Sequence, residues 1–199
     1  MGIVKRAADL VYTIRFLTLL VTPFDKTTAF ELGIIDEKGK KNKNFDMNAT
    51  PNTRAKYKDA YTPFHRLVFN IKRLMGKVPG GSSRIASYAA ALYLIKENYS
   101  VSEKRILKAL KESGVDHTDI LVEENNWFVL EDGQLSPGVY KLRHEKVADS
   151  VELILYPNDK VTVGPEAMPV GDMFGINIYE ATHIRSRQKL YVTSMELIR

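Results

Sequence analysis

Residues 62–77 read Thr62-Pro-Phe-His-Arg-Leu-Val-Phe-Asn-Ile-Lys-Arg-Leu-Met-Gly-Lys77, and this stretch carries the clearest structural signal in the chain. Thr62 followed by Pro63 is typical of a helix start, with a capping residue and a first-turn proline. Apolar residues then recur at spacings of three and four, which predicts a helix with one buried face that ends near Gly76. The apolar positions are Phe64, Leu67, Val68, Ile71, Leu74 and Met75.

The opposite face of this predicted helix is basic. Its polar residues lie at i, i+4, i+7 and i+11, and three lysines repeat the geometry on a later predicted helix. Rows of cations can neutralise several phosphates and give salt-sensitive affinity that is largely blind to base sequence. The alternative interpretation is a solvated surface, or one docked on an acidic protein. The predicted nucleic-acid-binding residues are Arg66, Asn70, Lys72, Arg73, Lys77, Lys104, Lys108 and Lys111.

Other helices are expected on both sides of this stretch. In segment 3–21 the same spacing predicts a helix that buries the face formed by Ile3, Ala7, Leu10, Ile14, Leu17 and Val21. A short helix is expected from Thr22 to Gly33, and two more over 84–98 and 100–113. Segment 36–60 is polar and rich in lysine, which predicts a long, mobile loop.

Beyond Val115 the apolar period changes from helical spacing to two, which is typical of strands. Short strands separated by turn signals are expected at 127–130, 139–143, 151–156, 161–163, 173–179 and 190–195. We therefore predict an α+β chain, with an N-terminal helical bundle followed by a small antiparallel β sandwich or barrel-like module.

Charge changes at the same place as the periodicity. Residues 1–115 hold 21 Lys and Arg against 10 Asp and Glu, a formal charge of +11, whereas residues 116–199 hold 8 against 14, a charge of −6. We predict two domains, a basic helical domain at 1–115 and an acidic antiparallel β module at 116–199. The basic part suits an anionic partner, and the acidic part does not.

No recognisable catalytic or metal-binding pattern is present. The chain has no cysteine, which rules out disulfides and thiolate ligands, and its four histidines are dispersed. The run Asp116-His117-Thr118-Asp119 is interpreted as a polar linker and not as a metal site. We expect no catalytic residue, metal or cofactor. The enzyme alternative requires a concave pocket with converging polar groups.

One turn and a set of aromatic residues could bind a ligand, but both are interpreted as structural. The turn 76–83 precedes a helix, but it lacks the P-loop signature and is interpreted as a helix connector. Trp127, Tyr140, Tyr156, Tyr179 and Tyr191 could stack on bases if exposed, yet the acidic charge around them favours core packing or a protein interface.

The apolar N-terminal segment is not expected to enter a membrane. Arg15 interrupts it, and about 20 uninterrupted apolar residues are needed to span a bilayer. No targeting signal is recognised, which favours the cytoplasm or a particle assembled there.

Two stretches resemble a known family. Residues 8–20 through 30–36, and 61–73 through 87–92, resemble a family of conserved, poorly characterised proteins of tailed bacteriophages, including T-even-like myoviruses. The resemblance covers about half of the chain and, weakly, the final hairpin. It implies a late, virion-associated product and carries over no catalytic residue.

These observations lead to two functional hypotheses. The first is a non-enzymatic bacteriophage structural or assembly protein, part of an oligomeric assembly. Its basic helical face contacts DNA or an acidic subunit, and its β module docks on another virion protein. The alternative is an intracellular phage regulator that binds nucleic acid or nucleic-acid machinery. The expected location is the virion, or the cytoplasm of an infected bacterial host.

Overall fold

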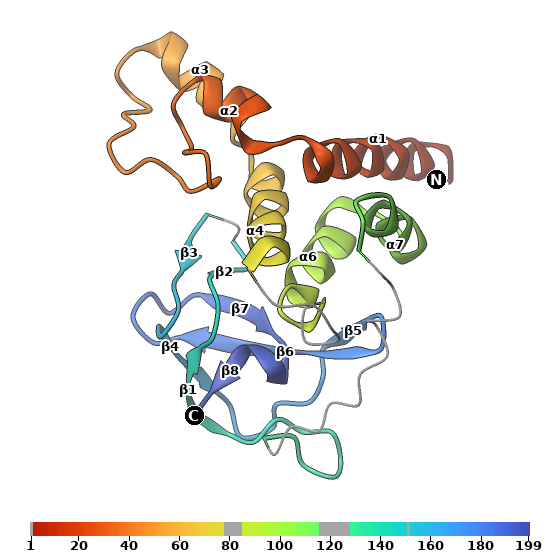
Figure 1. Ribbon diagram of the computed structural model, residues 1–199. Coiled ribbons are helices and arrows are strands. Elements are labelled where there is room, and N and C mark those ends of the chain that lie inside the picture. The colour runs from red at the N-terminus through yellow and green to blue at the C-terminus, as the bar shows by residue number, and fades with distance from the viewer. Residues whose placement is uncertain (1, 78–84, 116–127, 151) are drawn as a thin grey trace.

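Helices occupy the N-terminal part of the chain and antiparallel strands the C-terminal part, as the computed structural model shows (Figure 1). The structure describes residues 2–77, 85–115, 128–150 and 152–199. The predicted α+β class is confirmed. The described helices are α1 (Gly2–Val21), η1 (Phe24–Lys26), α2 (Thr28–Glu31), α3 (Pro51–Ala60), α4 (Pro63–Lys77), α6 (Ala89–Tyr99) and α7 (Glu103–Glu112).

The predicted loop over 36–60 is wrong in its second half, which forms helix α3. Thr50 caps this helix by accepting a hydrogen bond from the Thr53 amide at 3.0 Å, and Pro51 occupies the first turn. This is the same Thr-Pro start signal as at residues 62 and 63. It went unrecognised because the helix is polar and exposed on most sides, so the apolar period that marks α4 is missing.

The main sheet has the strand order β5-β6-β4-β1-β8, with β7 also paired to β6, and a separate hairpin joins β2 to β3. All of these pairings are antiparallel. No pairing joins the outer strands β5 and β8 within the described ranges, so the predicted antiparallel module is not a closed barrel. The strands are β1 (Gly138–Leu142), β2 (Lys146–Val147), β3 (Ile154–Leu155), β4 (Lys160–Val163), β5 (Gly171–Met173), β6 (Ile176–His183), β7 (Lys189–Val192) and β8 (Leu197–Ile198).

The strand predicted over 173–179 is a hairpin in the structure. Met173 pairs with Ile176, and the two residues between them form the turn. Phe174 and Gly175 have φ angles of 56° and 80°. Positive φ at both central residues is the geometry of a tight hairpin turn whose twist matches that of the strands. The sequence does not indicate this turn, because a bulky apolar residue such as Phe174 rarely adopts a positive φ angle.

One apolar cluster joins the helices to the sheet. Helix α6 lies against β5, β6 and β7, and α1, α4 and α7 pack around it (Figure 1). Val147, Met173, Ile176 and Ile178 belong to the same buried cluster as the helix residues. Basic helices and acidic strands therefore share a core. The domain boundary at residues 115 and 116 stays a prediction.

Helix α1 forms as predicted but buries a different face. Phe16 and Leu20 are 0% and 5% exposed, whereas Leu10, Ile14 and Val21 of the predicted face are more than half exposed. The spacing correctly indicated a helix. It could not indicate the side on which α4, α6 and α7 pack, since α1 carries apolar residues on both sides. In the described ranges no helix combines the length and apolarity needed to cross a bilayer.

Thr62 and His65 cap the start of α4. Thr62 Oγ1 accepts from the His65 amide at 3.3 Å, and His65 Nδ1 accepts from the Thr62 amide at 3.3 Å. This reciprocal pair has the arrangement of a capping box, with histidine in the place that Glu or Gln usually fills. Burial, reinforced by the Arg15 guanidinium, lowers the pKa of His65 to about 4.

The free energy of unfolding should fall as the pH drops from about 6.5 to about 4. In that window His65 becomes protonated in the unfolded chain, where its pKa is about 6.5, but stays neutral in the folded chain, where its pKa is about 4. After allowance for partial solvent screening, the loss should be about 2 kcal/mol. His65→Gln keeps a capping acceptor without this titration, so denaturant unfolding should show a smaller pH dependence. An unchanged pH dependence in the variant would contradict the assignment.

Candidate anion-binding pocket

Two of the five residues on the predicted basic face of α4 are buried. Asn70 and Arg73 are 1% and 6% exposed, although the sequence places them opposite the apolar stripe. Both contact Glu145, in the segment just before β2. Arg73 Nε donates to Glu145 Oε1 at 2.7 Å, and Asn70 Nδ2 donates to the same oxygen at 3.1 Å. A second nitrogen of Arg73 completes the ion pair.

Arg73 also fixes the loop that precedes α3. Its Nη1 donates to the carbonyl of Gly39, whose φ of 71° suits glycine. A Cβ at this glycine would lie 2.4 Å from the Phe24 ring, so no larger residue fits without a shift. The Asp36 carboxylate accepts from the amides of Lys38 and Lys40 at 2.9 Å and 2.8 Å. The lysine-rich segment thus has a defined backbone path over the end of α4.

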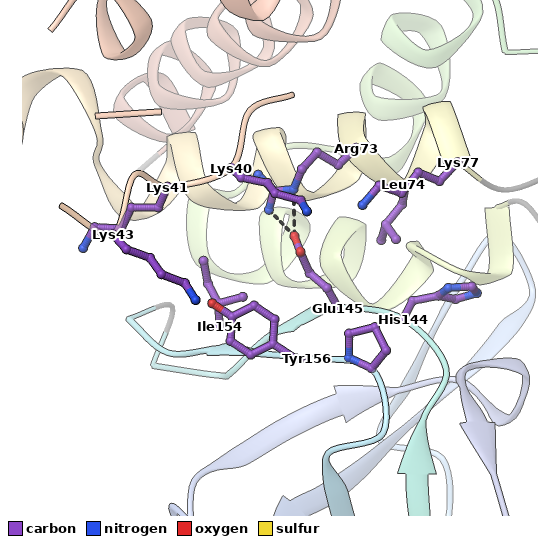
Figure 2. A pocket seen from close by; sticks show the side chains of 11 residues that line it. Lys40, Lys41, Lys43, Arg73, Leu74, Lys77, His144, Glu145, Ile154 and Tyr156 are labelled. Carbon is purple, nitrogen blue, oxygen red and sulfur yellow. Dashed lines mark hydrogen bonds and ion pairs between the residues drawn. The ribbon is translucent and has the colours of Figure 1, made fainter. Parts of the chain in front are cut away.

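Loop, helix and hairpin together enclose a pocket of about 490 Å³ (Figure 2). Its cations come from two elements that are separate in sequence, the loop and the last turns of α4. Five cationic side chains face one carboxylate, which Arg73 already engages. With neutral His144 the formal charge of the lining is +4. The lining residues are Lys40, Lys41, Lys43, Arg73, Leu74, Lys77, His144, Glu145, Ile154, Tyr156 and Pro157.

The lysines of this pocket are available to a ligand. Lys40, Lys43 and Lys77 are exposed, and among the described residues no ion pair involves them. Lys41 lies over the Tyr57 ring, 5.5 Å from its centroid. Burial lowers the pKa of His144, and the charges of Arg143, Lys146 and Lys77 lower it further. Imidazole protonation is disfavoured because the ring is partly buried and the neighbouring charges are positive.

The opposite wall of the pocket is apolar and aromatic. Ile154 comes from β3, and Tyr156 and Pro157 follow it (Figure 2). Tyr156 is 56% exposed. The other described tyrosines of the predicted stacking set have core or packing roles. Tyr140 and Tyr179 are buried, and the Tyr191 ring lies 5.3 Å from that of Tyr93.

The remaining predicted site residues lie elsewhere. Lys72 donates to the Thr22 carbonyl and lies over the Phe24 ring, and burial lowers its pKa. Arg66 lies over the Tyr61 ring at 5.5 Å. Lys104, Lys108 and Lys111 are exposed on α7 and line a different hollow with Arg105. Of the predicted set, the structure therefore brings only Arg73 and Lys77 to the pocket.

Three of the features discussed in the sequence analysis cannot be compared with the structure. The run 116–119, most of the turn 76–83, and Trp127 lie outside the described residues. In the described part of the chain no cluster of three His, Asp or Glu side chains could hold a metal ion.

The sequence contained a signal for part of this pocket. The lysines at 38, 40, 41 and 43 stand out in composition, but no local pattern indicated that their loop lies over the end of α4. Chemically, the arrangement suits a compact anion that carries several oxygens, which convergent ammonium groups can neutralise together. No family model, curated protein or solved structure matches this chain.

Proposed function

We propose that this protein is a non-enzymatic component of a bacteriophage particle, or of its assembly, and that it holds nucleic-acid phosphates in the basic pocket. The observation that carries the nucleic-acid part is the convergence of four exposed lysines, from a loop and a helix, on one concavity. Among the described lining residues the only carboxylate is that of Glu145, and it is already paired with Arg73. Phosphates entering the pocket would therefore meet unpaired ammonium groups.

The pocket favours phosphates over the side chains of an acidic protein partner. Its cations surround a concave space and do not form a flat row, so a group must enter it to meet several lysines at once. A phosphodiester presents two charged oxygens on a narrow, flexible chain. A protein carboxylate reaches the same depth only from a protruding loop.

The virion context of the proposal comes from the resemblance of residues 8–36 and 61–92 to tailed-phage proteins. Docking of the strand-rich part on another virion protein has one supporting feature. Met168 and Val170, just before β5, are 49% and 46% exposed and offer apolar surface to a partner. Mass spectrometry of purified particles should detect the protein in stoichiometric amount. Its presence only in infected cells would favour the alternative, an intracellular regulator of nucleic-acid machinery.

Replacing Lys40, Lys43 and Lys77 together with glutamine should weaken oligonucleotide binding by roughly 30- to 100-fold at moderate salt. The slope of log K against log salt should become shallower by about 2, because up to three phosphate contacts are lost. All three side chains are exposed, so the fold should persist. Fluorescence anisotropy over a salt series measures both quantities.

The matched control replaces Lys104, Lys108 and Lys111 of α7 with glutamine. It removes the same number of exposed positive charges at a distance from the pocket. A small, non-specific decrease in affinity is expected. If this variant lost as much affinity as the pocket variant, or more, nucleic acid would contact α7 and the pocket assignment would be wrong.

A further inference from the structure

The basic pocket has two chemically different walls. Lys40, Lys43 and Lys77 reach it from the loop and from α4, and Ile154 and Tyr156 reach it from β3 and the residues after it (Figure 2). Pro157 also lines the pocket. A site that held only phosphates would gain nothing from an aromatic wall. A nucleotide has the same division, with a charged phosphate at one end and a flat aromatic base at the other.

The aromatic wall is held by a fixed turn. The amide of Tyr156 donates to the Asp159 carboxylate at 2.8 Å, and the amide of Asp159 donates back to the Tyr156 carbonyl at 3.0 Å. Asn158, with a φ of 72°, donates its amide to the carbonyl of Leu142 in β1 at 2.8 Å. The backbone of Tyr156 is therefore tied to the sheet, while the residue as a whole is 56% exposed and lines the same pocket as the lysines.

We propose that the pocket selects nucleotides whose base is unpaired, so that single-stranded nucleic acid is its ligand class. The base stacks on the Tyr156 ring while the lysines hold the adjoining phosphates. This inference rests on the proposed function. Base-on-aromatic stacking tolerates any sequence and is the usual device of single-strand binders. In a duplex the bases are stacked inside and cannot reach the tyrosine without being flipped out.

The size of the pocket agrees with this ligand class. A volume of about 490 Å³ lies within the range of small-ligand sites and suits about one nucleotide. A duplex could touch only the rim, where the lysines but not the tyrosine would meet its phosphates. The acidic charge of the strand-rich part has little effect here, because Glu145, the one carboxylate among the described lining residues, is paired with Arg73.

The test compares three probes on the full chain: a short oligothymidylate, the same strand in duplex with oligodeoxyadenylate, and thymidine monophosphate. Wild type should bind the single strand roughly tenfold more tightly than the duplex, which is the typical contribution of one stacked base. Tyr156→Ala should abolish this preference and leave duplex binding unchanged. Tyr156→Phe, which keeps the ring, should retain it.

The outcomes separate this inference from the proposed function. Suppose that wild type binds the single strand and the duplex equally, and that replacing Lys40, Lys43 and Lys77 with glutamine abolishes both. Single-strand selection would then be wrong, but phosphate binding in the pocket would stand. Absence of binding by every probe would contradict both. If thymidine monophosphate bound as tightly as the strand, the ligand would be a free nucleotide and the single-strand assignment would fail. Circular dichroism of both Tyr156 variants checks that the exposed substitution leaves the fold intact.

Discussion

Replacing Glu196 with alanine should lower the free energy of unfolding by about 3–5 kcal/mol, because it leaves the buried ammonium group of Lys146 without a partner. The two side chains form an ion pair in which Lys146 is 4% exposed and Glu196 is 0% exposed. Burial lowers the pKa of Lys146 and raises that of Glu196, while each charge partly offsets the shift of the other. Urea unfolding at pH 7 measures the loss.

The pair also organises the chain around it. Glu196 accepts the Thr193 amide at 2.8 Å, and Thr193 Oγ1 donates to the Ala86 carbonyl at 3.1 Å. One buried network thus connects β2, the short helix η3 (Ser194–Glu196) and the segment that precedes α6.

An exposed ion pair in the same sheet supplies the control. Lys189 Nζ lies 2.9 Å from Glu180 Oε1, and the two side chains are 63% and 39% exposed. Glu180→Ala should change the free energy of unfolding by less than about 1 kcal/mol. A similarly small change for Glu196→Ala would show that the buried pair contributes little, and would contradict the prediction.

Arg73→Ala should also cost about 3–5 kcal/mol of stability, because Glu145 would remain largely buried without its cation. The Glu145 side chain is 13% exposed, and Asn70 alone would be left to bond it. The carbonyl of Gly39 would lose its guanidinium donor at the same time. Thermal or urea unfolding should reveal this loss, with weaker oligonucleotide binding as a consequence of the altered pocket.

Lys77, one turn further along α4, is the matched comparison. It lines the same pocket but is exposed, so Lys77→Ala should change stability by no more than about 0.5 kcal/mol while still weakening binding. If Arg73→Ala left stability unchanged and impaired binding alone, Arg73 would be a free member of a basic surface. Charge reversal at Arg73 is a poor probe of binding, since it would set two carboxylates against each other.

The different structural roles of Arg73 and Lys77 show what helical spacing can and cannot predict. The spacing correctly indicated that Arg66, Asn70, Arg73 and Lys77 share a side of one helix, since that follows from helical geometry. Which neighbour covers that side depends on the fold. Glu145 lies 72 residues from Arg73 in sequence, and nothing local to either residue indicates their pairing.

The same limit applies to α1 and to the strands. Apolar residues on two sides of α1 left its buried face undetermined, and the structure selected Phe16 and Leu20. Longer strands such as β6 have an alternating apolar pattern that the sequence displays. Strands β2, β3 and β8 have only two residues each and are defined by their pairing with neighbouring strands. A period-two pattern therefore cannot reveal them.

Tyr156 shows why average composition does not indicate the charge around an individual tyrosine. The acidic charge of the C-terminal part is an average over its residues, and it does not indicate which charges lie near a given tyrosine. In the structure Tyr156 lines a pocket with loop lysines that precede it by more than a hundred residues, whereas Tyr140 and Tyr179 are buried as the core interpretation predicts.

Photocrosslinking of a single strand containing 5-iododeoxyuridine, followed by mass spectrometry of the crosslinked peptides, locates the nucleic-acid contact most directly. We expect the crosslink at Tyr156, with its yield reduced when Lys40, Lys43 and Lys77 are replaced by glutamine. Crosslinks confined to α7, or none under conditions where the strand is bound, would contradict the assignment of the basic pocket as the nucleic-acid site.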